Sequence, residues 1–234
     1  MPYLYGFDIT YLIFIVPCII LSLVCQIMVQ SAFSRYSKVR NSRNMTGAQA
    51  AEYVLRQNGV YNVRIEHVSG ALTDHFDPRS NTIRLSDSVY NTASVAAVGV
   101  AAHEAGHAVQ HAQNYLPNKI RSAILPVARI GSQLSWIFII LGFIFYYKVG
   151  TVLLYIGIIL FSASVLFTVA TLPVEFNASR RALTTIKGTN LLPPEEYAGA
   201  KSVLRAAAMT YVASAITAIM QLLRLIFIAR RRDN

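Results

Sequence analysis

The chain has 234 residues, of which 54% are hydrophobic and only 14% are charged, a balance that is typical of membrane proteins and not of soluble globular domains. Its net charge of +10 could suggest a nucleic-acid partner. The basic residues, however, gather beside apolar stretches and not in a patch interleaved with aromatic residues. We therefore expect a lipid bilayer rich in anionic lipid as the partner, and no nucleic acid.

The first apolar stretch runs from Ile9 to Ser34 without one acidic or basic residue. As a helix it is long enough to cross the roughly 30 Å of hydrocarbon in a bilayer, so we expect residues 1–34 to form an N-terminal transmembrane anchor. Cys18 and Cys25 fall inside this stretch and are interpreted as small buried hydrophobic residues. Basic residues crowd only its C-terminal side, which places residues 35–129 in the cytosol by the positive-inside rule: Arg35, Lys38, Arg40 and Arg43.

Residues 44–92 predict a small α+β module. Thr46 can cap a helix that ends at Asn58-Gly59, and the segments 63–68 and 82–86 alternate like short strands with turn residues between them. An exposed strand edge here could bind a substrate peptide by adding it to the sheet, and a plain structural hairpin is the alternative. His67 and His75 have no metal-ligand spacing, so we expect them to make only local hydrogen bonds.

Residues 103–107 read His103-Glu104-Ala105-Gly106-His107. The segment 95–112 contains no proline and predicts a helix, on which residues four apart share a face. Two imidazoles so placed can hold one zinc ion, while Glu104 reaches a water at the metal. Gly106 weakens the helix, so we expect it to admit another segment at close range. The alternative is an ordinary buried helix with hydrogen-bonded histidines.

A second apolar block, residues 130–174, is interrupted only by Lys148 and predicts a transmembrane hairpin with a short turn. Basic residues flank both ends, so we expect both in the cytosol. The last segment, 175–234, contains a weaker apolar stretch from Ala206 to Leu223. If it crossed the membrane, residues 230–232, all arginine, would lie outside, which favours a helix on or beneath the membrane and leaves the question open.

A catalytic zinc site needs a third protein ligand. His111 lies a further turn along the helix and cannot reach a metal between His103 and His107, and the position of a metzincin third histidine is Gln113. Glu175 remains, because the hairpin returns it toward the cytosolic end where the metal helix lies. A simple ion pair of Glu175 with a neighbouring arginine is the alternative, and Glu195 and Glu196 are then the candidates.

The motif, the hairpin and the run VEFNASRRA at residues 174–182 resemble the YugP-like neutral zinc metallopeptidases of bacterial membranes over essentially the whole chain. More distantly, they resemble the HtpX and CAAX prenyl protease group, whose third ligand is the glutamate of an ExxxD motif. The resemblance implies that His103, His107 and Glu175 bind zinc and that Glu104 is the catalytic base. Ser179 stands where that motif has aspartate, so Asn177 or Ser179 is expected to make the hydrogen bond to a ligand histidine.

We therefore predict a mainly α membrane protein of zincin (gluzincin-like) type, with three to four apolar helices, a cytosolic α+β module and an HExxH helix. Its expected activity is zinc-dependent endopeptidase cleavage of polypeptides, with one zinc per chain, at the bacterial plasma membrane. Tyr211 and Arg205 are weak candidates to stabilise the oxyanion. A non-catalytic metal-binding scaffold is the alternative, as is a site-2-type intramembrane protease, although the LDG motif of that class is missing.

Overall fold

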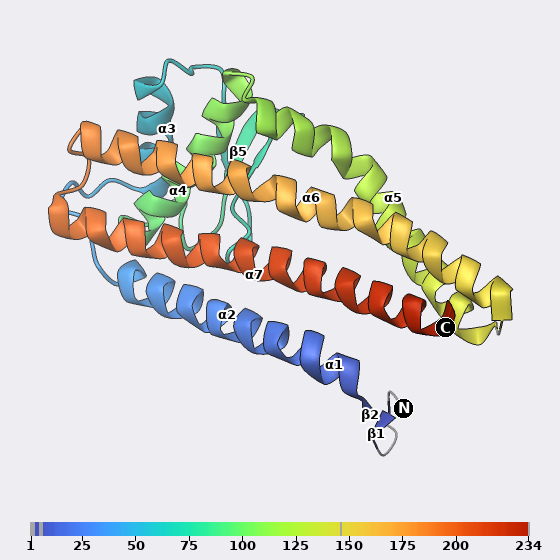
Figure 1. Cartoon of the computed structure of the whole chain (residues 1–234). Helices are drawn as coiled ribbons and strands as arrows, with labels where there is room; N and C mark the ends of the chain where they lie inside the picture. Colours follow the sequence, from blue (N-terminus) through green and yellow to red (C-terminus); the bar gives the residue numbers. More distant parts are fainter. Residues whose placement is uncertain (1–2, 5–6, 146, 234) are drawn as a thin grey trace. The chain divides into compact units, whose positions relative to one another are not determined.

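The computed structural model describes residues 3–4, 7–145 and 147–233 and is mainly helical (Figure 1). Its elements, in chain order, are β1 (Tyr3–Leu4), β2 (Phe7–Asp8), α1 (Ile9–Phe14), α2 (Val16–Ser37), α3 (Gly47–Gln57), β3 (Arg64–His67), β4 (His75–Asp77), β5 (Thr82–Leu85), α4 (Val95–Ala112), α5 (Leu116–Ile144), α6 (Tyr147–Gly188) and α7 (Pro194–Asp233). The chain forms two compact units. Unit 1 comprises Met1–Val24, Lys119–Leu172 and Thr210–Asn234, and unit 2 comprises Cys25–Asn118 and Pro173–Met209.

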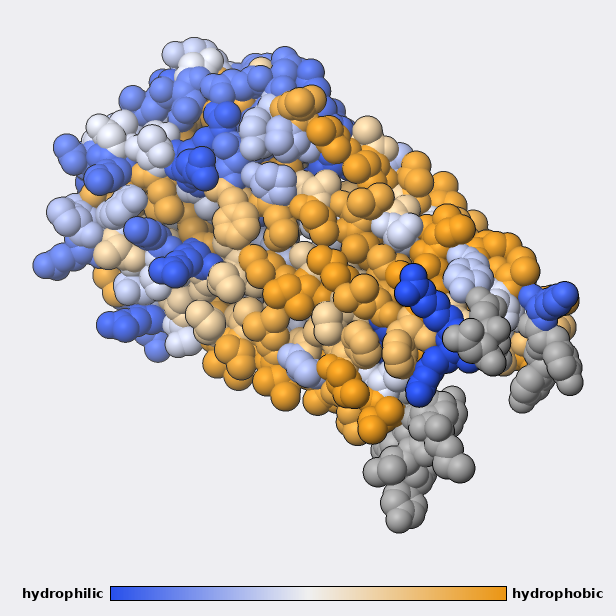
Figure 2. All heavy atoms as spheres, in the orientation of Figure 1, coloured by the Kyte–Doolittle hydropathy of each residue, from blue (hydrophilic) through white to orange (hydrophobic). Residues whose placement is uncertain are grey.

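Four helical segments are long and apolar enough to cross a membrane: Ile9–Ser37, Leu116–Ile144, Lys148–Gly188 and Pro194–Arg231. The first three match the predicted anchor and hairpin. The weaker stretch from Ala206 to Leu223 is part of one continuous helix, α7, which meets the same criteria of length and composition. Figure 2 shows apolar side chains over much of the surface of the long helices and hydrophilic ones gathered around α3.

Unit 1 is held together by close helix contacts. A side chain at Gly131 of α5 would meet the carbonyl oxygen of Leu160 in α6 at 2.8 Å, so only glycine allows the two backbones to approach this closely. Leu225 and Ala229 of α7 join the same apolar core, whose other members come from α5 and α6. Arg224, a charge within an apolar run, donates a hydrogen bond to the buried Thr10 hydroxyl (3.1 Å).

Unit 2 contains the predicted α+β module. Thr46 caps α3 as expected, through reciprocal bonds with Gln49 (a capping box), and α3 packs on α4 through a core of small residues that includes Ala51 and Ala101. The sheet has the strand order β3-β5-β4. Both predicted strands exist, as β3 and β5, but the interpretation of the two as a hairpin was wrong, because they pair in parallel. A third strand that the sequence did not reveal, β4, pairs with β5 in antiparallel fashion.

The helix α4 spans Val95–Ala112, as the sequence predicted, with Ser94 at its N-cap. A Cβ atom at Gly106 would lie 2.5 Å from the carbonyl oxygen of Ala178 in α6. The expectation that Gly106 admits another segment is therefore confirmed, and the segment is the part of α6 that carries Glu175. This close crossing places the motif helix against the candidate third ligand.

Candidate metal centre

His103 and His107 lie one turn apart on α4 and face each other. Their Nε2 atoms are 3.1 Å apart, and each side chain is 14% exposed. Two Nε2 atoms at this distance repel each other as neutral acceptors unless a proton or a cation lies between them. The pair could therefore hold a cation between its two nitrogen atoms.

Glu175 on α6 completes a triangle with the two histidines. Its Oε2 atom lies 3.4 Å from the Nε2 of His103 and 3.4 Å from the Nε2 of His107. This oxygen is buried and has no hydrogen-bond partner among the described residues. A buried carboxylate oxygen without a partner is costly, so its position is explained best by a ligand that all three atoms share.

The size of this triangle fits zinc. Bonds from zinc to nitrogen and oxygen ligands are about 2.0–2.2 Å long. With tetrahedral angles between these bonds, the ligand atoms lie about 3.3–3.6 Å from one another. The three observed separations are 3.1, 3.4 and 3.4 Å. Two imidazoles and one carboxylate are also the donor set of catalytic zinc sites in which water takes the fourth position. No other cluster of three such groups occurs within the described residues.

A hydrogen-bond network fixes the orientation of His107. The Nε2 group of Gln110 donates to the carbonyl oxygen of Val174 (2.8 Å) and to Oδ1 of Asn177 (3.0 Å). The Oε1 atom of Gln110 must therefore face His107 Nδ1, 3.2 Å away, which donates its proton. His107 Nε2 is then the unprotonated atom, directed at the triangle. Arg181 secures Asn177 by donating to the same Oδ1 atom (2.7 Å).

Ser179 fixes the orientation of His103, because its hydroxyl oxygen lies within hydrogen-bond distance (3.0 Å) of the Nδ1 atom of His103. Ser179 thus occupies the place that an aspartate has in the ExxxD motif. Asn177 acts on the other histidine, through Gln110. Both residues named from the sequence therefore contribute, but Gln110 was missed, because a glutamine in a helix has no distinguishing pattern.

Charges around the triangle raise the pKa of His107 above its ordinary value. Burial acts in the opposite direction, but the contact with Glu175 and the negative charges of Glu104 and Glu175 outweigh it. A cation that binds here therefore competes with protonation of His107 more than it would at an ordinary histidine.

Glu104 follows His103 directly on α4 and is buried, with 8% of its surface exposed. Within the described residues its carboxylate makes no hydrogen bond or ion pair, so it is free to accept a proton from water.

Comparisons with known proteins indicate the family of this chain. Residues 11–230 match the model of a family described as "Putative neutral zinc metallopeptidase". The chain belongs to this zinc metallopeptidase family. It is also 43% identical over 217 residues, 92% of this chain and 95% of the other protein, to "Putative membrane protease YugP" of Bacillus subtilis (strain 168). No solved structure matches the chain. The resemblance noted in the sequence is therefore confirmed.

The remaining candidate residues lie outside the triangle. His111 packs against the ring of Phe76 (5.7 Å between ring centroids), and His67 bonds to Asp87 (2.6 Å). Glu196 accepts a hydrogen bond from the backbone of Ser42. Tyr211 belongs to unit 1, whereas the triangle belongs to unit 2. The positions of His67 and His111 agree with the sequence, which excluded both as ligands.

Proposed function

We propose that this protein is a membrane-anchored zinc endopeptidase in which His103, His107 and Glu175 hold one zinc ion. The observation that carries the proposal is the triangle of ligand atoms with the partnerless Oε2 of Glu175. The family and the name of its relative support the same class. Since the third ligand is a glutamate, we assign the site to the gluzincin type.

The zinc ion, when bound, supplies an electrophile for the scissile carbonyl and lowers the pKa of water to about 7. Glu104 accepts the proton of the attacking water and then donates it to the nitrogen of the leaving amine. Its burial and its lack of hydrogen bonds leave the carboxylate available for this transfer. Gln110 and Ser179 hold the two imidazoles so that each Nε2 faces the reaction site.

The proposed substrate is a polypeptide in extended form. The strand β4 lies at an edge of the sheet and packs against α4, the helix that carries both histidines. A peptide that adds to this edge would run beside the metal helix, with its backbone fixed by hydrogen bonds and its side chains free to vary. Such binding suits an endopeptidase of broad specificity, and membrane proteins are included among its substrates.

The proposed orientation places residues 35–129, with the metal helix, in the cytosol at the bacterial plasma membrane, with several helices crossing the bilayer. Basic residues after the first span and at both flanks of the hairpin support it. Cysteines introduced at Ser80 and at Lys148 test it with a membrane-impermeant thiol reagent on intact cells. Only the cysteine at position 148 should react. Labelling of the cysteine at position 80 would show that the orientation is the opposite of the one proposed.

The decisive experiment compares purified wild-type protein with Glu104→Gln and Glu175→Ala. We expect the wild type to bind one zinc ion and to cleave an unfolded protein substrate. Glu104→Gln should keep the zinc and lose cleavage, whereas Glu175→Ala should lose the zinc. A Glu104→Gln variant with unchanged cleavage contradicts the mechanism. A zinc-loaded wild type that cleaves nothing favours the metal-binding scaffold.

A further inference from the structure

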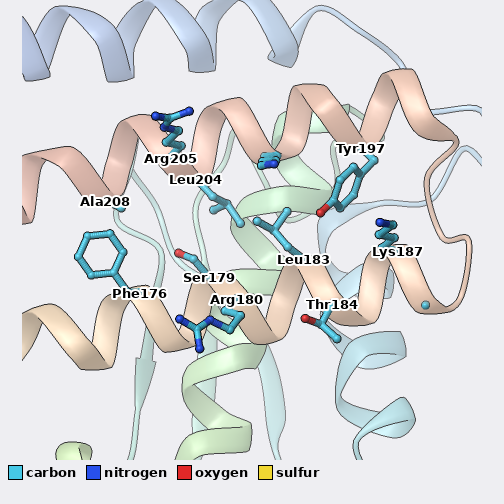
Figure 3. A pocket seen from close by; sticks show the side chains of 12 residues that line it. Phe176, Ser179, Arg180, Leu183, Thr184, Lys187, Tyr197, Leu204, Arg205 and Ala208 are labelled. Carbon is cyan, nitrogen blue, oxygen red and sulfur yellow. The ribbon is translucent and has the colours of Figure 1, made fainter.

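A groove of about 730 Å³ lies in unit 2, between the C-terminal part of α6 and the N-terminal part of α7. Its floor is apolar and includes Phe176 and Leu183 of α6 and Leu204 and Ala208 of α7. Figure 3 shows Leu183 and Leu204 facing each other across it. The volume lies in the range of small-molecule sites, about 300–1,000 Å³.

The charged side chains that line this groove are all positive. Arg180, Lys187, Lys201 and Arg205 are all exposed, and no acidic residue lines the groove. Over the described part of the chain, none of these four side chains forms a hydrogen bond or an ion pair. The groove therefore presents four uncompensated cations above an apolar floor, which suits a ligand with an anionic head and an apolar body.

The groove meets the candidate metal centre at Ser179. Ser179 lines the groove and contacts His103 at Nδ1, whereas the Nε2 atom of the same imidazole faces Glu175. A peptide at the metal must approach from the Nε2 side.

We propose that this groove binds an anionic phospholipid of the surrounding bilayer. The groove is formed by two helices that are candidate membrane spans, and Phe176 on its floor is 43% exposed, so that an acyl chain can enter from the apolar surface of α6. Lys187 and Lys201 lie toward the ends of the two helices that the connecting loop joins, where the phosphate of the headgroup would bind. An acidic water-soluble peptide would leave the apolar floor without a partner.

The experiment measures lipid binding to purified full-length protein in neutral detergent by native mass spectrometry. Phosphatidylglycerol is compared with phosphatidylcholine of the same acyl chains and with soluble glycerol phosphate. We expect phosphatidylglycerol to bind at least about tenfold more tightly than either, since each basic side chain contributes a factor of about five. The double variant Lys187→Glu/Lys201→Glu should remove this preference. The control Arg56→Glu/Arg79→Glu, in the α+β module, changes the net charge of the same unit equally and should keep it.

A second variant tests the apolar part of the groove. Ala208→Trp fills the floor without a change of charge and should weaken phosphatidylglycerol binding, with melting curves to confirm folding. Equal losses in the groove and control variants would show a general surface potential and overturn the proposal. Tight binding of glycerol phosphate alone, or displacement of the lipid by an acidic peptide, would overturn it as well. None of these measurements depends on proteolytic activity, so they are independent of the proposed function.

Discussion

The network around His107 predicts that replacement of Gln110 by methionine weakens the metal site without touching a metal ligand. Gln110 is fully buried and makes three hydrogen bonds, to His107, Val174 and Asn177. Methionine has a similar length and volume but neither donates nor accepts strongly. In Gln110→Met the imidazole of His107 can rotate or place its proton on Nε2, the atom that should bind zinc.

The expected loss has two parts. Removal of such an orienting partner typically weakens metal binding about 10- to 100-fold, or about 1.4–2.7 kcal/mol. The metal-free protein should also lose about 2–4 kcal/mol of stability, because the buried Nδ1 group of His107 and the Val174 carbonyl each lose a partner, whereas Asn177 keeps its bond from Arg181. The site should thus be weaker but still able to bind zinc.

Competition with a chelator of known affinity measures the zinc dissociation constant, and thermal melting after metal removal measures the stability. The matched control is Gln113→Met, because the exposed side chain of Gln113 bonds to Arg181 alone among the described residues, and it should change stability by no more than about 0.5 kcal/mol. If Gln110→Met binds zinc as tightly as the wild type, the network does not orient His107.

Three further outcomes are expected. Gly106→Ala places a methyl group against the backbone of α6 and should lower the thermal midpoint, at a cost of about 1–3 kcal/mol, whereas Gly188→Ala, with open space around it, should not. Ser179→Ala should weaken zinc binding about tenfold through His103, while Ser179→Asp should restore it in an equilibrium titration. The Asp77 carboxylate accepts hydrogen bonds from a serine hydroxyl and a backbone N–H, which lower its pKa to about 2. The contribution of the ionised carboxylate to stability is therefore present above pH 4 and is lost as the pH falls toward 2. Melting curves should then show the difference between wild type and Asp77→Asn shrinking over that interval.

The features that depend on local sequence could be predicted. The motif helix follows from residue types with helical spacing, and the cap at Thr46 follows from a residue type that caps helices. Glu175 was named as the candidate third ligand because a transmembrane hairpin returns to the side of the membrane on which it began. The apolar block and its basic flanks were enough to predict that hairpin. The role of Gly106 was predicted correctly because glycine destabilises a helix, so its presence there indicates that another segment packs closely against it.

The features that depend on contacts between distant residues could not be predicted. The arginines at the end of the last apolar stretch left its placement open, and the sequence gives no sign that Arg224 donates a hydrogen bond to Thr10, 214 positions earlier in the chain. The strand β4 has only three residues, too few for an alternating pattern to be recognised. Gln110 acquires its role only from the part of α6 that crosses above it.

Unit 2 is discontinuous, and this sets the order in which the protein can become active during synthesis. His103 and His107 leave the ribosome first, and the chain must then complete the whole of Lys119–Leu172, which belongs to unit 1, before Glu175 is made. A nascent chain that stops short of this point carries only two of the three proposed zinc ligands. The proposed proteolytic activity would thus be withheld until the hairpin has been synthesised, and a partly made chain would be harmless to the proteins around it.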